Sequence, residues 1–182
     1  NSIDIKNYVV DYSGNNGTNA TASTRTLVPT IKTAHSTNTD VTLTDLSANT
    51  FYDLSAHLIN DEDISNNKIV ASGTTRPTNF VESHISRNIG DTTQTKLVMN
   101  VDNHQVAGTL KIDKYVFDIS GTNGTNASLQ TVDKTPTNQL AESSNTDVSL
   151  NDLSANTLYE MKLHMFNEND MSNSKIDISG VT

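Results

Sequence analysis

Residues 147–159 read DVSLNDLSANTLY and restate residues 40–52, which read DVTLTDLSANTFY. The two stretches lie 107 residues apart, and the same offset pairs Tyr8 with Tyr115. No gap is needed to align residues 5–75 with the second copy. A period near one hundred residues is too long for a solenoid unit and matches one β-sandwich domain. The chain therefore contains a domain-sized internal repeat.

Apolar residues alternate with polar ones inside each copy. In the second copy, Tyr115, Phe117 and Ile119 share one face of an expected strand. Further along, apolar residues at positions 159, 161, 163 and 165 alternate with Glu160, Lys162 and His164. Alternation with period two is typical of strands that bury one face, and we find no convincing apolar stripe at helical spacing. The sequence therefore predicts an all-β fold.

The second copy has a lead-in, residues 76–108, that the first copy lacks, because Ser2 already aligns with Thr109. The lead-in predicts two further strands, one near Phe80–Ile85 and one over Thr95–Val101. The side chains expected to face the core are Val81, Ile85, Leu97, Met99 and Val101. We therefore predict a partial domain over residues 1–75 and a complete domain over residues 76–182.

Loss of these two strands has a large energetic consequence. Five buried side chains at about 1.5–3 kcal/mol each contribute roughly 10 kcal/mol, which is comparable to the whole stability of a domain, about 5–15 kcal/mol. We expect residues 1–75 not to fold alone. The missing strands would come either from a preceding part of a longer array, which we favour, or from a neighbouring subunit that donates strands.

The segments Leu46–Tyr52 and Leu153–Tyr159 resemble the L-x-P-x-T-x-Y segment of the fibronectin type III domain family. The resemblance implies that each segment forms the E–F corner of a sandwich. Tyr52 and Tyr159 would then be tyrosine corners, with each hydroxyl bonded to nearby backbone. It implies tandem fibronectin type III-like β-sandwiches, the first of which lacks its two N-terminal strands and contains strands C to G.

Other parts of the pattern agree with this family or depart from it. The N-x-x-x-x-S spacing of the F–G turn occurs at residues 60–65 and 167–172, and Tyr8 and Tyr115 stand at the strand C aromatic position. The departures are Ala48 and Ala155 in place of Pro, and Asp63 and Asp170 in place of Gly. The chain has no Trp, so Met99 or Val101 is expected to fill the space of the strand B Trp.

Four N-x-[ST] sequons lie in one duplicated loop, after the strands of Tyr8 and Tyr115. Their acceptors are Asn16, Asn19, Asn123 and Asn126. They are candidate N-glycosylation sites if the chain is secreted from a eukaryotic host. The competing interpretation is a plain turn, in which Gly14 and Gly17 adopt positive φ.

Acidic and histidine residues suggest no catalytic or metal site. The predicted F–G turns at residues 61–63 and 168–170 are acidic, but their spacing fits no calcium-loop pattern and a solvated turn explains them. His57 and His164 fall on an outward strand register, while His35, His84 and His104 fall in loops or on polar faces. No nucleophile or metalloprotease motif occurs. We predict a protein that is not an enzyme and needs no cofactor or metal.

Charge and hydropathy limit the classes of partner that the chain is expected to bind. Lys and Arg number 12 against 21 Asp and Glu, which disfavours nucleic acid, and no run approaches the roughly 20 apolar residues that membrane insertion requires. We predict a structural or adhesive repeat module of an extracellular, cell-surface or virion-surface fibre, with neighbouring copies of the repeat, and glycans, as partners. The alternative is a binding or spacer module attached to a secreted hydrolase, which predicts a patch of exposed aromatic side chains.

Overall fold

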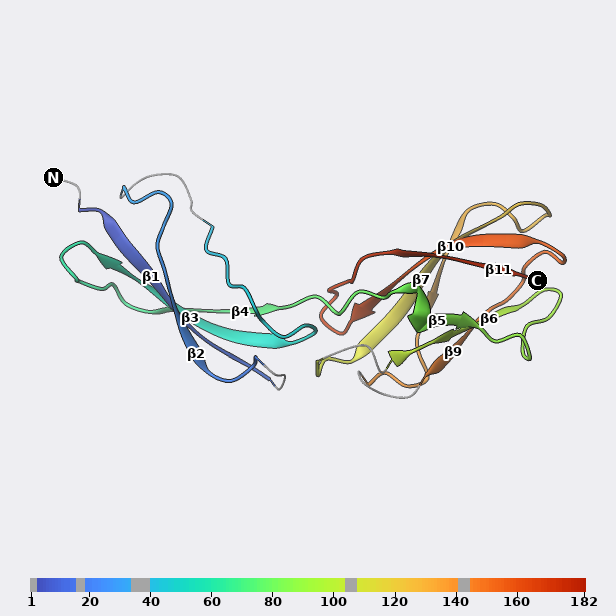
Figure 1. The fold of residues 1–182 in the computed structure, drawn as a ribbon, viewed down its shortest axis with the longest axis horizontal. Helices are drawn as coiled ribbons and strands as arrows, with labels where there is room; N and C mark the ends of the chain where they lie inside the picture. Colours follow the sequence, from blue (N-terminus) through green and yellow to red (C-terminus); the bar gives the residue numbers. More distant parts are fainter. Residues whose placement is uncertain (1–2, 16–18, 34–39, 104–107, 141–144) are drawn as a thin grey trace. The chain divides into compact units, whose positions relative to one another are not determined.

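The computed structural model describes residues 3–15, 19–33, 40–103, 108–140 and 145–182 (Figure 1). The chain divides into two compact units, unit 1 (residues 1–75) and unit 2 (residues 76–182). Within the described ranges, the regular elements are β-strands and short 3₁₀ turns, and no α-helix is present. The predicted all-β fold is therefore confirmed.

Unit 2 is a sandwich of two antiparallel sheets. The four-stranded sheet has the order β11-β10-β7-β8 and the three-stranded sheet the order β5-β6-β9. The first sheet consists of β7 (Ile112–Gly121), β8 (Gln130–Lys134), β10 (Leu158–Asn167) and β11 (Ile176–Val181). The second consists of β5 (Ile85–Arg87), β6 (Leu97–Val101) and β9 (Thr146–Leu150). The partner of β6 is therefore β9, which lies far from it in the sequence, with β7 and β8 in between.

The core of unit 2 lies between its two sheets. Because successive side chains of a strand point to opposite faces, alternate residues of β7 and β10 enter this core. Tyr115, Phe117 and Leu163 are fully buried there, at 0% exposure. Leu97, Met99 and Val101 of β6 meet them from the opposite sheet, as the sequence predicts, with Val148 and Leu150 of β9 beside them. Apolar burial between the sheets therefore stabilises unit 2.

Unit 1 forms a single four-stranded sheet with the order β2-β1-β3-β4. Its strands are β1 (Ile5–Gly14), β2 (Ser23–Leu27), β3 (Phe51–Asn60) and β4 (Ile69–Thr74). The pairing register matches that of unit 2, since Tyr8 lies opposite Leu58 as Tyr115 lies opposite Met165. The described part of unit 1 contains no second sheet.

One predicted strand of unit 1 is absent. Residues 40–43 correspond to residues 147–150 of β9 and are nearly identical to them in sequence, yet they form no strand. In unit 2, β9 pairs with β6, which has no counterpart in the described part of unit 1. The strand E that was expected in unit 1 therefore does not form over the described residues 40–43, because a strand needs a partner for its ladder.

The lead-in of unit 2 also differs from the prediction near Phe80. A 3₁₀ turn, η1 (Glu82–His84), interrupts the predicted strand, and β5 begins only at Ile85. Phe80 is buried at 6% exposure, whereas Val81, which was expected to face the core, is 51% exposed. Val81 has extended backbone, with φ −118° and ψ 161°, so its side chain points away from that of Phe80. Phe80 therefore takes the core position.

The exchange of roles between Phe80 and Val81 can be tested by substitution. Phe80→Ala removes a buried ring and should lower the free energy of unfolding of unit 2 by about 3–5 kcal/mol. Val81→Ala should change it by less than about 0.5 kcal/mol, because the side chain is exposed. Urea unfolding of both variants measures the difference. A larger loss for Val81→Ala than for Phe80→Ala would contradict the structure.

Candidate functional site

Tyr159 anchors the E–F corner of unit 2. Its side chain is 1% exposed. The Ser154 N–H donates to the Tyr159 hydroxyl at 2.7 Å, and the hydroxyl donates to the Asn126 carbonyl at 3.3 Å. One buried ring thus ties the start of β10 to the corner and to the loop after β7. The hydroxyl pairs with the Ser154 N–H and the Asn126 carbonyl, two backbone groups that would otherwise be buried without a hydrogen-bond partner.

Tyr52 has the same surroundings in unit 1 and is 2% exposed. Its hydroxyl accepts from the Ser47 N–H at 2.8 Å and donates to the Asn19 carbonyl at 3.3 Å. The corner therefore forms in unit 1 even though the second sheet is absent there. Its contacts come from the sheet and loops that both units contain.

Glycines make room for the two corner rings. A Cβ on Gly121 would lie 2.9 Å from Cε1 of Tyr159, and a Cβ on Gly14 would lie 2.7 Å from Cε1 of Tyr52. Neither glycine has positive φ; Gly124 does, at 102°. The expectation of positive φ at Gly14 is wrong, and Gly17 lies outside the described residues. Gly14 is required by the close approach of the ring instead.

The described sequon asparagines are exposed but differently engaged. The Asn126 Nδ2 donates to the Asp152 carbonyl at 2.7 Å, so this side chain helps to hold the corner. The side chains of Asn19 and Asn123 are exposed and form no such bond within the described residues. Asn16 lies outside those residues. Asn19 and Asn123 therefore present the more accessible acceptor nitrogens, and glycosylation stays a prediction.

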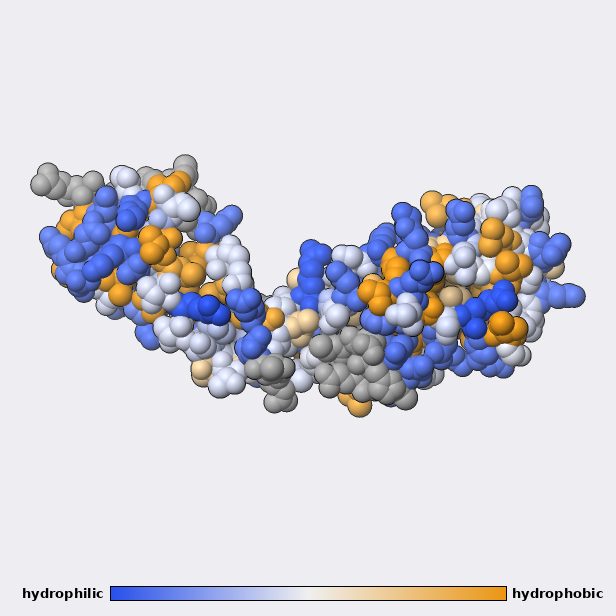
Figure 2. Space-filling view, viewed as in Figure 1, coloured by the Kyte–Doolittle hydropathy of each residue, from blue (hydrophilic) through white to orange (hydrophobic). Residues whose placement is uncertain are grey.

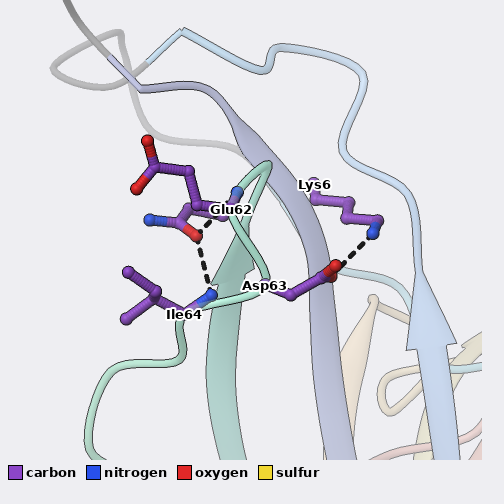
Figure 3. A network of polar contacts seen from close by, with 5 residues as sticks. Lys6, Glu62, Asp63 and Ile64 are labelled. Atoms are coloured by element: carbon purple, nitrogen blue, oxygen red, sulfur yellow. Dashed lines mark hydrogen bonds and ion pairs between the residues drawn. The ribbon is translucent and has the colours of Figure 1, made fainter.

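The acidic F–G turns are fixed by their own backbone geometry. Asn60 Oδ1 accepts from the N–H groups of Glu62 and Ile64, at 3.1 and 2.8 Å (Figure 3). Asp63 adopts a left-handed φ of 59° and pairs with Lys6 at 2.6 Å. The left-handed φ explains why the fibronectin type III pattern has Gly at this place. No group of three ligating side chains is found among the described residues.

The outward face of each sheet carries a repeated polar cluster. In unit 2, Asp118 accepts from Lys175 Nζ at 2.6 Å and from the Thr131 hydroxyl at 2.8 Å, and these contacts lower the pKa of its carboxyl. Asp11, Thr24 and Lys68 repeat the cluster in unit 1. These ion pairs are partly exposed, so each adds little stability. They link neighbouring strands across the outer surface.

Among the described residues, the histidines form no hydrogen bond with these clusters. His164 packs against Phe166 with ring centroids 5.0 Å apart, and burial lowers its pKa. His57 lies on the same outward register in unit 1, opposite Val9. His84 Nδ1 accepts from the Val81 N–H at 3.4 Å. His35 and His104 lie outside the described residues.

The inner face of the unit 1 sheet is the candidate functional site, and we call it the open face. Strand pairing puts its apolar side chains on one side of the sheet, and they are Tyr8, Val10, Tyr12, Leu54, Leu58 and Ile69. Tyr8 is only half-buried, whereas its counterpart Tyr115 is fully buried. Ile69 is 66% exposed, whereas its counterpart Ile176 is half-buried and packs against the core. Val10 and Tyr12 are nevertheless buried, at 5% and 7% exposure, so the centre of this face is covered although the described residues of unit 1 form no second sheet.

The open face is also shallower at its centre. Val10 and Ala56 are opposite each other, where unit 2 has Phe117 opposite Leu163. Ala71 replaces Ile178 on the neighbouring strand. Protein cores pack to nearly uniform density, so smaller side chains on one layer require larger ones on the other.

Comparison with known proteins gives structural neighbours only. No protein-family model matches the sequence, and no curated protein matches it. A segment of two fibronectin type III domains from chicken tenascin has 14% identity and a TM-score of 0.49, covering 97% of this chain and 85% of that chain. The FN1–FN3 domains of chicken CNTN1 have 13% identity and a TM-score of 0.41, covering 97% of this chain and 54% of that chain. Both are fibronectin type III segments, the family that the E–F corner motif resembles.

Sequence reasoning missed a pair of terminal threonines. The Thr182 hydroxyl donates to the Ser154 carbonyl at 2.7 Å and accepts from the Thr157 N–H at 3.1 Å. Thr75 repeats the contact with Ser47 in unit 1, at 2.6 Å. The last residue of each unit is thus tied to the E–F corner. The offset of 107 residues between Thr75 and Thr182 was the available signal.

Removal of the corner hydroxyl should destabilise unit 2. Tyr159→Phe leaves the Ser154 N–H without its buried acceptor and should cost about 1–3 kcal/mol of unfolding free energy. Glu160→Gln is the matched control, because Glu160 is the exposed next residue of β10. Thermal and urea unfolding measure both variants. Equal stability of Tyr159→Phe and the control would show that the corner bond contributes nothing.

Backbone protection should differ sharply between the units. In a monomer, the amides of β1 and β3 should exchange faster than those of β7 and β10, because only the latter lie in a covered sandwich. Hydrogen exchange of residues 1–182, followed by mass spectrometry, measures this difference. Equal protection in a sample shown to be monomeric by sedimentation would refute the requirement for added strands.

Proposed function

We propose that the chain is a structural or adhesive repeat module of an extracellular, cell-surface or virion-surface fibre, without enzymatic activity. The observation that supports this most directly is the duplication itself. The same sheet, corner and terminal threonine occur twice in one chain. A module that is repeated along one chain is suited to a place in an array of neighbouring copies.

Surface composition agrees with a soluble array. Hydrophilic residues are spread over the visible surface of both units (Figure 2). The net charge of −9 gives neighbouring modules a mutual repulsion that keeps a long array from collapsing on itself. Exposed Asn19 and Asn123 would carry glycans in a eukaryotic secretory pathway. Neighbouring repeats are the partners that this organisation favours.

The aromatic residues do not favour the alternative of a carbohydrate-binding module attached to a hydrolase. That alternative requires a patch of exposed aromatic side chains. The chain has four Phe, five Tyr and no Trp, all of which lie in the described ranges. Each of them is buried or half-buried. The fibre module is therefore the function that we propose.

The terminal threonine supplies a route for load. Tension applied at Thr182 passes through its hydroxyl to the corner at Ser154 and Thr157, and from there through Tyr159 to the core. The strand ladders then resist extension as a unit. This arrangement suits a module that holds spacing under tension.

Pulling the chain by its two ends tests the proposal. Force spectroscopy of residues 1–182 should show a resisting step for unit 2, with a gain in contour length of about 350 Å for its 107 residues. Thr182→Val should lower the force of that step, whereas Thr135→Val, in an exposed loop, should not. Extension without any resisting step would overturn the proposed function.

A further inference from the structure

The loop after β7 contains an asparagine that a glycine follows directly. Asn16 and Asn123 are the two asparagines of the sequence with this neighbour, and Asn16 lies outside the described residues. We infer that Asn123 is a site of spontaneous deamidation, at which the backbone nitrogen of Gly124 converts the side-chain amide into a succinimide and then into aspartate or isoaspartate. The inference does not depend on the proposed function.

The reaction needs water as its one co-reactant. The Gly124 nitrogen loses its proton to solvent and forms a bond to Cγ of Asn123, while the bond from Cγ to Nδ2 breaks and ammonia leaves. Water then opens the cyclic imide at either carbonyl carbon. Opening at Cγ gives aspartate, and opening at the backbone carbonyl gives isoaspartate, whose main chain runs through Cβ and Cγ. Because attacking and attacked groups belong to adjacent residues, their effective concentration is high.

The Gly124 nitrogen is available for this attack. Gly124 is exposed, and its N–H has no hydrogen-bond partner among the described residues. Without a Cβ, the residue leaves the approach to Asn123 unobstructed. The fold also requires glycine here, since its φ is 102° and a Cβ would lie 2.4 Å from Cβ of Ser154. The structure thus demands, after Asn123, the residue type that obstructs the reaction least.

The Asn123 side chain is free to rotate toward that nitrogen. It is exposed and forms no hydrogen bond with the described residues. Asn126, in the same loop, gives the contrast. Its Nδ2 donates to the Asp152 carbonyl at 2.7 Å, and the N–H of the following Ala127 donates to the Gly124 carbonyl at 3.3 Å. Both groups that would react at Asn126 are therefore held by hydrogen bonds.

Isoaspartate at position 123 would loosen the E–F corner. The Asn123 carbonyl accepts from the Thr157 hydroxyl at 3.1 Å, and Thr157 is buried at 2% exposure. In isoaspartate this carbonyl becomes part of a free carboxylate, and the main chain gains one carbon before Gly124. The close approach of Gly124 to Ser154 leaves no room for the extra length on that side. The turn must therefore move away from the corner.

Ageing of the unglycosylated chain tests the assignment of the site. Residues 1–182 are incubated at mildly acidic and at mildly alkaline pH, and peptide mapping by mass spectrometry follows each asparagine. Asn123 should convert at least about tenfold faster than Asn126, because the hydrogen bond that Asn126 must break accounts for about fivefold alone. The rate should rise with pH, because the attacking nitrogen must lose its proton. Labelling by an isoaspartyl methyltransferase should map to position 123.

Two substitutions separate the charge of the product from its altered main chain. Freshly purified Asn123→Asp has the charge with an ordinary main chain, so the amides of Thr157 and Leu158 should exchange as in the natural chain. In the isoaspartate form these amides should exchange about fivefold faster, which corresponds to the loss of one hydrogen bond. Asn123→Gln keeps an amide but must close a larger ring, so ageing at this position should stop.

Each contrary result is specific. Equal conversion of Asn123 and Asn126, a rate that does not change with pH, or an aged chain that retains asparagine at position 123 would overturn the site. Unchanged exchange of Thr157 in the isoaspartate form would overturn its effect on the corner, and equal acceleration in fresh Asn123→Asp would assign that effect to charge instead of the main chain. The force measurement of the proposed function is independent of all these results.

Discussion

A sheet with one apolar face is stable only when that face is covered, and this constraint organises both halves of the chain. In unit 2 the cover is a second sheet, and Tyr115, Phe117 and Leu163 lose all contact with solvent beneath it. The described residues of unit 1 form one sheet, on which Tyr8 is half-buried while Val10 and Tyr12 are buried at 5% and 7% exposure. Hydrogen bonds within a ladder cannot compensate for the loss of a cover, because their net contribution is small compared with the burial of a whole apolar face.

The tyrosine corner shows which parts of a sandwich do not need the second sheet. Tyr52 is as well buried as Tyr159, although only Tyr159 lies in a complete sandwich. The Tyr52 hydroxyl bonds to the backbone of Ser47 and Asn19, and both residues lie in loops of unit 1. The corner thus ties the start of β3 to Ser47 and to the loop after β1 in unit 1 as well.

Much of this fold could be predicted from the sequence, since period-two alternation identified the buried faces of β7 and β10. The limits are equally physical. Residues 40–43 and 147–150 are almost identical, yet only the latter form part of a strand, because pairing depends on β6 and not on local sequence. Alternation also could not show whether Phe80 or Val81 faces the core, because the 3₁₀ turn that follows them interrupts the period of two. The role of Gly14 depends on a ring that is distant in sequence.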